Sequence, residues 1–324
     1  MTKVFALFVV VCIREACLKS FKNAVLLPAD RPKSLVGRFV TPYGMYDSNG
    51  DPIKGTPIFT SVKSTMPYQP RRSAYEIEQT FDQKMIYGGS IIGWFGHFIT
   101  ESVPHLIAAA SVRKHHPDAK IIAHTWGKFD QEEWKKRFSV HLAYFLNKLG
   151  MTPNDIHFVL NPVRVQELIV PEPAFHTKFL CKKWILEEVD ALWPAGGTFE
   201  RIYFSRTQVE KSRLANEVEV ENLFAQNGFE IVHPQNYSFD EQIKMVRGAK
   251  ILAGPQGSAL HWSLYSNTCQ SVLSLGYPSL LQRGICFSRG QEYSELRGKR
   301  PRNAERRVRE VSTPQLKKAL IKLS

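Results

Sequence analysis

This sequence of 324 residues is poor in cysteine and contains no paired cysteine motif. There is no CxxC pair, no Cys/His cluster with zinc-ligand spacing and no HExxH sequence. These absences argue against a disulfide framework and against a zinc site. They predict free, mostly buried thiols in a reducing compartment. The five cysteines are Cys12, Cys17, Cys181, Cys269 and Cys286.

The sequence also lacks a hydrophobic run at its start that is long enough for a membrane helix. The apolar stretch Val4–Ile13 has about half of the roughly 20 residues that a membrane span needs. Only Lys3 precedes it, and Arg14 and Glu15 follow at once without a small-x-small cleavage site, which disfavours a signal peptide. A buried first strand is the favoured interpretation, and a signal-peptide core is the alternative. A strand here predicts a cytoplasmic protein.

Acidic residues are scarce in residues 297–324. This segment contains ten Lys/Arg against two Asp/Glu, in a chain with a formal net charge of +13. Such a block is either a solvated segment or a surface for nucleic acid, acidic lipid or another anionic polymer. No aromatic residue follows Leu296, so this segment offers no ring for base stacking, which disfavours nucleic acid as a partner. We expect peripheral contact with the inner face of a membrane.

The pattern of apolar residues predicts an α/β protein of two domains, which the chain length also favours. Residues 1–80 read as short strands and turns, including a hairpin turn at Asp47–Asp51. Residues 81–195 alternate between strands and helices, and Trp193–Gly197 forms the expected boundary because it combines proline with two glycines. The alternation starts again over residues 196–278, and residues 279–324 read as a basic helical segment.

The expected elements follow from periodicity and capping residues. A helix over 95–115 is expected to be interrupted near Pro104. The other expected helices are 136–149, 178–192, 217–227, 238–247 and 259–265. The expected strands are 120–125, 156–160, 165–170, 201–205, 229–232, 250–253 and 271–275.

Two features of the second half predict an anion site. The turn Gly254–Ser258 follows a strand and opens a helix, where free N–H groups favour phosphate. Ser205-Arg206 ends another strand of the same sheet, and Arg213 follows it. Ligands of open α/β sheets bind beyond the carboxyl ends of the strands, and arginine forks hold diphosphate oxygens. The alternative is that these arginines pair on the surface with Glu210, Glu217 or Glu219.

One feature of the first half predicts a general base. His97 and Glu101 are four residues apart, so they share a face of a helix. A histidine with a carboxylate can accept the proton of a substrate hydroxyl. The alternative is a capping pair or a polar pair in the core.

These motifs, taken in order, resemble glycosyltransferase family 61 over roughly residues 85–277. The ordered series is more specific than any single motif. The residues that carry the resemblance are Gly96-His97-Phe98 with Glu101 and Pro104, Ile202–Arg206, Arg213, Asn216–Glu219, Gly228–Pro234, Ser238–Ala249 and Gly254–Tyr265.

The resemblance implies a GT-B-like fold, with two Rossmann-like domains facing a cleft, to which the strand pattern of residues 1–80 adds a β-rich N-terminal extension. It implies inverting, metal-independent transfer from a nucleotide-sugar to a glycan acceptor, with no other cofactor, and it favours the bacterial branch that makes capsular polysaccharide. It implies that Glu101 or His97 is the base, and that Glu219 contacts the ribose or the nucleobase. The implied donor contacts are Ser205, Arg206, Arg213, Glu219, Gln256, Gly257 and Ser258.

The sequence departs from the family pattern at two positions. Gln256 stands where the family's "G-P-H-G" turn has histidine, and Trp262 stands where "L-T-N" has asparagine. Both departures point to an altered donor pocket. They also favour a second hypothesis, a non-catalytic protein of the same fold that binds sugar nucleotides or polysaccharide. A nucleic-acid-associated protein that uses its basic segment is a third.

Overall fold

The computed structural model describes residues 18–28, 44–53, 76–125, 139–177, 180–194, 196–197, 199–210 and 213–323. The fold is mixed α/β, and the chain divides into two compact units, Met1–Ala174 and Phe175–Ser324. The expected first strand at Val4–Ile13 lies outside the described residues.

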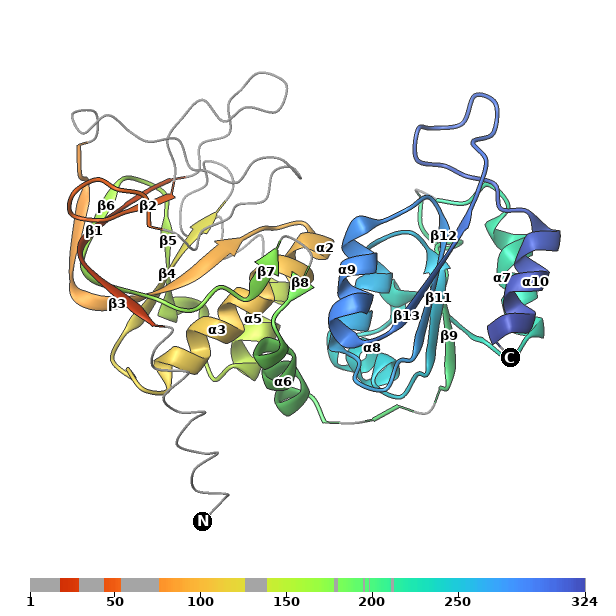
Figure 1. The fold of residues 1–324 in the computed structure, drawn as a ribbon, viewed down its shortest axis with the longest axis horizontal. Helices are drawn as coiled ribbons and strands as arrows, with labels where there is room; N and C mark the ends of the chain where they lie inside the picture. Colours follow the sequence, from red (N-terminus) through yellow and green to blue (C-terminus); the bar gives the residue numbers. More distant parts are fainter. Residues whose placement is uncertain are drawn as a thin grey trace, which may run out of the picture. The chain divides into compact units, whose positions relative to one another are not determined.

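The first unit is built on a mixed six-stranded sheet (Figure 1). In spatial order its strands are β2 (Gly44–Tyr46), β1 (Lys19–Leu27), β6 (Val163–Val170), β3 (Gln79–Ile91), β4 (Lys120–Thr125) and β5 (Ile156–Val159). Strand β1 pairs antiparallel with β2 and β6, whereas β3, β4, β5 and β6 run parallel. The described strands of residues 1–80 therefore belong to this sheet, not to a separate extension. The predicted hairpin turn is present, because Tyr46 bridges antiparallel to Pro52.

Among the described residues of this unit, three helices and two short helical turns accompany the sheet. They are α2 (Phe95–His97), a π-helical turn (Phe98–Ser102), α3 (Val103–Arg113), α5 (Ser139–Lys148) and a 3₁₀ turn (Pro153–Asp155). The predicted interruption of the first helix is confirmed, but it takes the form of the π turn immediately before Pro104. Proline is tolerated in the first turn of α3, because the backbone N–H that it lacks is not needed there for the hydrogen bonds of the helix.

The second unit contains a five-stranded sheet that is parallel throughout. Its strands, in spatial order, are β10 (Glu230–Val232), β9 (Arg201–Phe204), β11 (Ile251–Pro255), β12 (Ser271–Gly276) and β13 (Glu292–Arg297). Helices α7 (Glu217–Gln226) and α10 (Thr313–Leu323) cover one face, and α8 (Phe239–Val246) and α9 (Leu280–Arg289) cover the other (Figure 1). The remaining elements are β7 (Phe175–Thr177), β8 (Leu180–Cys181), α6 (Lys183–Leu192), a 3₁₀ turn (Pro234–Asn236) and the 3₁₀ helix η4 (Ser258–Tyr265).

Most of the predicted elements of the second unit are present. Ser238 caps α8 in a reciprocal box with Glu241, as its sequence predicts. The predicted helix over 259–265 is a 3₁₀ helix, and β13 lies within a segment that was expected to be helical. The helix predicted to begin at residue 178 begins at Lys183, because Leu180–Cys181 form β8.

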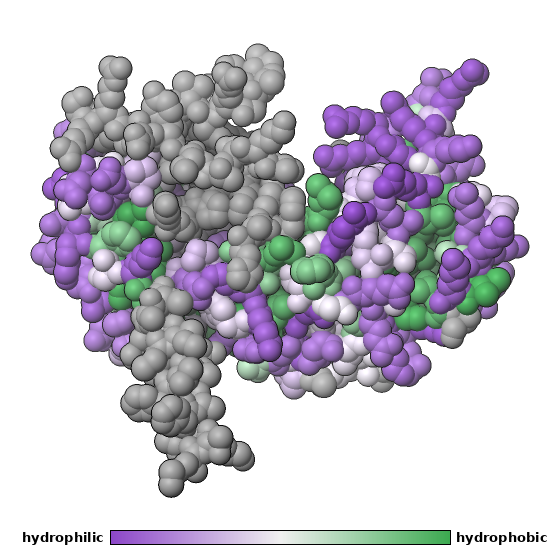
Figure 2. Space-filling view, viewed as in Figure 1, coloured by the Kyte–Doolittle hydropathy of each residue, from purple (hydrophilic) through white to green (hydrophobic). Residues whose placement is uncertain are grey.

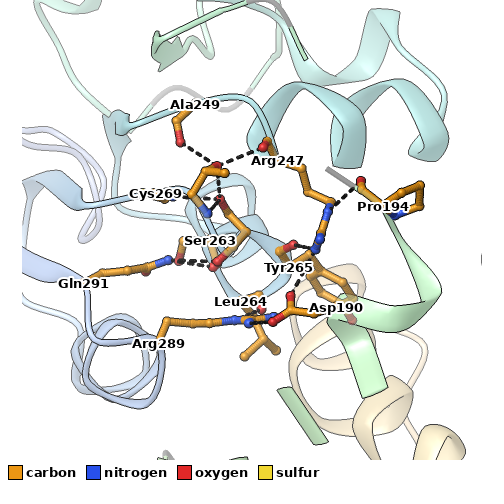
Figure 3. A network of polar contacts seen from close by, with 12 residues as sticks. Asp190, Pro194, Arg247, Ala249, Ser263, Leu264, Tyr265, Cys269, Arg289 and Gln291 are labelled. Atoms are coloured by element: carbon orange, nitrogen blue, oxygen red, sulfur yellow. Dashed lines mark hydrogen bonds and ion pairs between the residues drawn. The ribbon is translucent and has the colours of Figure 1, made fainter. Parts of the chain in front are cut away.

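The division between the units falls before α6, upstream of the expected boundary at Trp193–Gly197. Asp190 of α6 accounts for this difference, because its carboxylate binds two arginines of the second unit (Figure 3). The nitrogen–oxygen distances are 3.1 Å to Arg247 and 2.9 Å to Arg289. Both guanidinium groups also donate to the last carbonyls of η4, Arg247 to Tyr265 and Arg289 to Leu264. The C-terminal end of η4 is thus fixed by buried cations, which is where the helix dipole favours positive charge.

The described cysteines are free and buried, as the sequence predicts. Burial raises the pKa of both Cys181 and Cys269 to about 12, so these thiols stay protonated and inert at neutral pH. None of the helices in the described ranges combines the length and the apolar character needed to span a bilayer.

We expect the first unit to lose stability in mild acid because of His124. This side chain is fully buried, with Nδ1 2.8 Å from the Tyr87 hydroxyl and Nε2 3.0 Å from the Leu27 carbonyl. Burial lowers its pKa from 6.5 to about 4. The unfolded chain therefore binds the proton more readily than the folded chain, and stability falls as the pH drops below 6.5. For His124 alone the loss at pH 5 is about 2 kcal/mol.

Hydrogen exchange of the first unit at pH 7 and pH 5 measures this loss. His124→Gln should remove about 2 kcal/mol of the pH dependence, whereas His115→Gln, at an exposed position, should leave it unchanged. An unaltered pH dependence in His124→Gln would show that His124 is not the responsible group.

Candidate functional site

The first candidate site lies at the carboxyl edge of the parallel sheet in the second unit. Ser205 and Arg206 follow β9 directly. Ser205 is fully buried, and its hydroxyl hydrogen-bonds to the Glu221 carboxylate and, at 3.0 Å, to the Thr207 hydroxyl. The backbone N–H of Arg206 donates to Glu217 at 2.7 Å. The predicted Ser205 therefore shapes the loop, while Arg206 is held at the edge by its own backbone.

The two predicted arginines lie close to one another. Burial lowers the pKa of Arg206, and the positive charge of Arg213 lowers it further, while Glu217 opposes both effects. Arg213 Nη1 donates to the Tyr277 hydroxyl at 3.3 Å, and its buried Nε has no hydrogen-bond partner among the described residues. Two adjacent guanidinium groups with an unsatisfied donor favour a bound anion.

The turn Gly254–Ser258 lies at the same edge, because β11 neighbours both β9 and β12. A Cβ atom on Gly254 would lie 2.9 Å from the Phe204 carbonyl oxygen, so this glycine allows close packing on β9. A Cβ atom on Gly257 would meet only the Pro255 oxygen, at 3.7 Å, so its surroundings are open. The first N–H groups of η4, beginning at Ser258, have no partner within the helix and are available to an anion.

Gln256 is held by its backbone, whose N–H donates to the Leu275 carbonyl at 2.8 Å. Its side chain makes no hydrogen bond with a described residue and is partly exposed. Gln256, Gly257 and Ser258 are thus brought to the edge where Arg206 lies, as the sequence predicts. Their predicted contact with a donor stays a prediction.

Two further residues that were singled out from the sequence have partners inside the fold. Trp262 is fully buried and donates to the Gln242 side chain at 2.7 Å, so its side chain belongs to the core, and the altered donor pocket that it suggested stays a prediction. Glu219 accepts a hydrogen bond from the Thr313 hydroxyl at 2.7 Å and so connects α7 to α10. Its predicted role as a ribose or nucleobase contact stays a prediction.

The second candidate site lies on the π turn of the first unit. His97 Nδ1 lies 2.6 Å from a carboxylate oxygen of Glu101. The Glu101 side chain is 8% exposed and the His97 side chain is 44% exposed. A carboxylate can only accept, so Nδ1 carries the proton in this contact, and the lone pair of a neutral imidazole lies on Nε2. The structure therefore brings the predicted pair together and leaves the imidazole as its accessible member.

Neighbouring residues fix the position of this pair. His105 Nδ1 lies 2.7 Å from the Glu101 carbonyl oxygen, and burial lowers the pKa of His105, so its ring is neutral. Gly89 has φ +79°, and a Cβ atom there would lie 2.6 Å from the His105 Cβ, so only glycine fits. The Trp94 ring, 54% exposed, lies beside the His97 ring with their centroids 6.0 Å apart. A π turn inside an α-helix frequently marks a functional site.

The part of the chain that the structure describes contains no group of three or more His, Cys, Asp or Glu residues arranged to hold a metal ion. Arginines and helix N–H groups dominate the first candidate site, and this chemistry suits an anion better than a cation.

The sequence did not single out Tyr277 or Glu221 as site residues. Tyr277 follows β12 at the carboxyl edge and contacts Arg213, but no motif precedes it. Glu221 could have been found from its position one helical turn after Glu217, on the same face of α7.

Comparison with known proteins identifies the family of this chain. The family model described as Glycosyltransferase 61 matches residues 95–273, which is more than half of the chain and includes both candidate sites. A search of curated proteins gave no match. The matched range begins at the π-turn motif and ends in β12, so it includes the ordered motifs from Gly96 to Tyr265. The chain therefore belongs to the glycosyltransferase 61 family.

Proposed function

We propose that the protein is an inverting glycosyltransferase of GT-B type that moves a sugar from a nucleotide-sugar donor to a hydroxyl group of a glycan acceptor. The observation that carries this proposal is the pair Arg206 and Arg213 beside the start of η4, at the carboxyl edge of a parallel sheet. Ligands of open α/β sheets bind at this edge. Membership of the family indicates that the reaction is glycosyl transfer. The arginine pair offers a binding place for the diphosphate of the donor.

In the proposed reaction the diphosphate leaves as an acceptor hydroxyl attacks the sugar. The guanidinium groups of Arg206 and Arg213, together with the N–H groups at Ser258, stabilise the charge that develops on the leaving phosphate. Fixed donors of this kind need no reorganisation during the reaction. The Asp190 network supports the same function, because it fixes the far end of η4.

For the base we propose His97, with Glu101 as the residue that orients it. The carboxylate holds Nδ1–H, so Nε2 is the accepting atom of the accessible imidazole. When Nε2 takes the proton of the acceptor hydroxyl, the buried carboxylate stabilises the imidazolium that forms. The same division of roles operates in carboxylate–histidine pairs of hydrolases.

We expect Arg206→Ala to weaken the binding of the nucleotide donor. A charge-assisted hydrogen bond contributes about 1.5–3 kcal/mol, so the dissociation constant should rise about 10- to 100-fold. A thermal-shift screen against nucleotide sugars identifies the donor, because a ligand that binds the folded state raises its melting midpoint. Isothermal titration calorimetry then gives the dissociation constants.

Arg201→Ala is the matched control for this prediction. Arg201 begins the same strand at its opposite end, where its guanidinium group lies over the Phe229 ring. The substitution Arg201→Ala therefore removes the same positive charge without changing the proposed site. Equal donor affinity in wild-type protein and Arg206→Ala would contradict the role of Arg206.

A second proposal, a binding protein without turnover, is favoured by Gln256. Its amide cannot carry the positive charge that the family's histidine can place beside a phosphate. Donor hydrolysis and transfer, assayed with the donor from the screen, separate the two proposals. Binding without turnover in wild-type protein, with turnover restored in Gln256→His, would support the binding protein.

We further propose that the acceptor belongs to surface polysaccharide synthesis and that α10 contacts the inner face of a membrane. Lys317, Lys318, Lys322 and Ile321 are all exposed on α10, which suits acidic lipid. Deleting α10 would also remove its packing against α7, so exchanging the three lysines for glutamine is the cleaner test. Reduced sedimentation with phosphatidylglycerol vesicles is expected, with no effect on donor binding.

A further inference from the structure

The basic segment that follows β13 folds back onto the carboxyl edge of the sheet. Lys299 and Glu310 pair antiparallel through two backbone hydrogen bonds of 2.9 Å and 2.8 Å. Figure 1 shows this loop extending beyond β12, and the same region is strongly hydrophilic in Figure 2. Much of the positive charge that the sequence places in residues 297–309 is therefore carried by an ordered loop that returns to the anion site.

Arg309 is the residue of this loop that reaches the site. Its backbone forms a short parallel bridge with Leu214, through hydrogen bonds of 3.0 Å to the Arg213 carbonyl and 2.7 Å from the Ala215 N–H. Gly298 makes room for it, because a Cβ atom there would lie 2.8 Å from the Arg309 Cβ, whereas a Cβ atom on Gly276 would lie at an ordinary contact distance of 3.7 Å. The main chain thus places Arg309 directly beside Arg213.

The side chain of Arg309 is also positioned. Its guanidinium carbon lies 5.8 Å from the centroid of the Tyr277 ring, and the hydroxyl of the same tyrosine accepts from Arg213. Arg309 Nη1 donates to the carbonyls of Arg306 and Val308, both at 2.8 Å. Nε and Nη2, the other edge of the fork, have no partner among the described residues, and neither Arg213 nor Arg309 forms an ion pair there.

We propose that Arg309 is a third diphosphate ligand, which completes with Arg206 and Arg213 a three-arginine site for the donor. This inference rests on the proposed function and adds a residue that lies beyond the range matched by the family model, which ends at residue 273. Three guanidinium groups and a helix start match the charge of a diphosphate better than that of a single phosphate. In this proposal the ligand supplies the anion that balances the three cations.

Calorimetric titration with inorganic pyrophosphate and with the diphosphates of uridine, guanosine, adenosine, cytidine and thymidine tests the inference. Arg309→Ala should raise the dissociation constant of the best nucleoside diphosphate about 10- to 100-fold. The same substitution should raise the dissociation constant of pyrophosphate by a similar factor. The melting midpoint without ligand should hardly change, because the backbone bridge to Leu214 does not depend on the side chain.

Arg307→Ala is the matched control, since Arg307 is an exposed arginine of the same loop. Its dissociation constants should equal those of wild-type protein. An equal loss of diphosphate affinity in Arg307→Ala and Arg309→Ala would show that the loop acts only through its overall positive potential, and would overturn the specific site. Unchanged binding in Arg309→Ala, with weakened binding in Arg206→Ala, would overturn this inference and leave the proposed function standing. A wild-type protein that binds none of the diphosphates would overturn both.

Vesicles of phosphatidylglycerol distinguish a lipid phosphate from a nucleotide phosphate. Arg309→Ala and Arg307→Ala are expected to sediment equally with these vesicles. A loss of sedimentation confined to Arg309→Ala would assign the arginine site to a lipid head group instead of the donor.

Discussion

His97→Ala is expected to lower kcat for glycosyl transfer by about 10²- to 10⁴-fold, the range that general base catalysis contributes. The reason is the geometry of the pair, in which a buried carboxylate holds Nδ1 and leaves Nε2 to accept a proton. Donor affinity should stay near that of wild-type protein, because the proposed donor ligands belong to the other unit. The measurements are steady-state kinetics with the screened donor and calorimetry with the nucleotide alone.

Glu101→Gln refines this prediction. A neutral amide no longer stabilises the imidazolium and no longer fixes one tautomer, since it offers both an acceptor and a donor to Nδ1. We expect a loss of kcat smaller than that of His97→Ala. His115→Ala, at an exposed position beyond α3, is the control and should retain full activity. A larger loss in Glu101→Gln than in His97→Ala would reverse the two roles and make the carboxylate the base.

Asp190→Asn is expected to lower the free energy of unfolding of the second unit much more than the surface variant Glu187→Gln. The side chains of Arg247 and Arg289 are 2% and 5% exposed, and both rely on this carboxylate. Removing one partner of a buried ion pair costs about 3–5 kcal/mol, because the remaining charge is left uncompensated. Since Asp190 is itself 31% exposed, we expect the lower end, about 3 kcal/mol. Amide exchange in α6 and η4 should accelerate about 100-fold.

Glu187→Gln provides the comparison for Asp190→Asn. Glu187 lies on the same helix, 57% exposed, and its contact with Lys183 at 3.9 Å is a surface pair. Such pairs contribute about 0–1 kcal/mol, so exchange rates should barely change. Similar rates in both variants would mean that the arginines find other partners and that Asp190 does not anchor α6.

The periodicity of the sequence predicted the parallel sheet of the second unit well, because its strands and helices depend on local patterns. The apolar run at β11 and the capping box at Ser238 are signals of this kind. The strand β13 was missed because Glu292–Arg297 contains four charged or polar side chains in six positions and pairs only at the edge of the sheet. Helix α6 was predicted, but its membership of the second unit was missed, because an ion pair through Asp190 leaves no periodic trace in the sequence.

The candidate sites, too, could be predicted only where local sequence patterns indicate them. Arg206 and Arg213 were found because each lies near the end of a predicted strand, and His97 with Glu101 because their spacing is helical. The hydroxyl of Ser205 binds Glu221 within the loop, a contact that the sequence did not predict, and its contact with the donor stays a prediction. Tyr277 was not singled out, since it meets Arg213 through a contact between positions 64 residues apart. Contacts of this kind follow from the three-dimensional fold and not from local spacing.

The bridge between Leu214 and Arg309 also has a consequence for biosynthesis. Asn216, two residues beyond this bridge, hydrogen-bonds to Val311, which lies 95 positions later in the chain. At about 5–20 residues per second, synthesis needs roughly 5–20 s to cover that distance. For most of this interval a nascent chain contains β9 and α7 but lacks the Arg309 backbone N–H that pairs with the Arg213 carbonyl. A growing polypeptide on the ribosome therefore cannot yet form the complete proposed anion site, which is able to assemble only after residues 309–311 have been made.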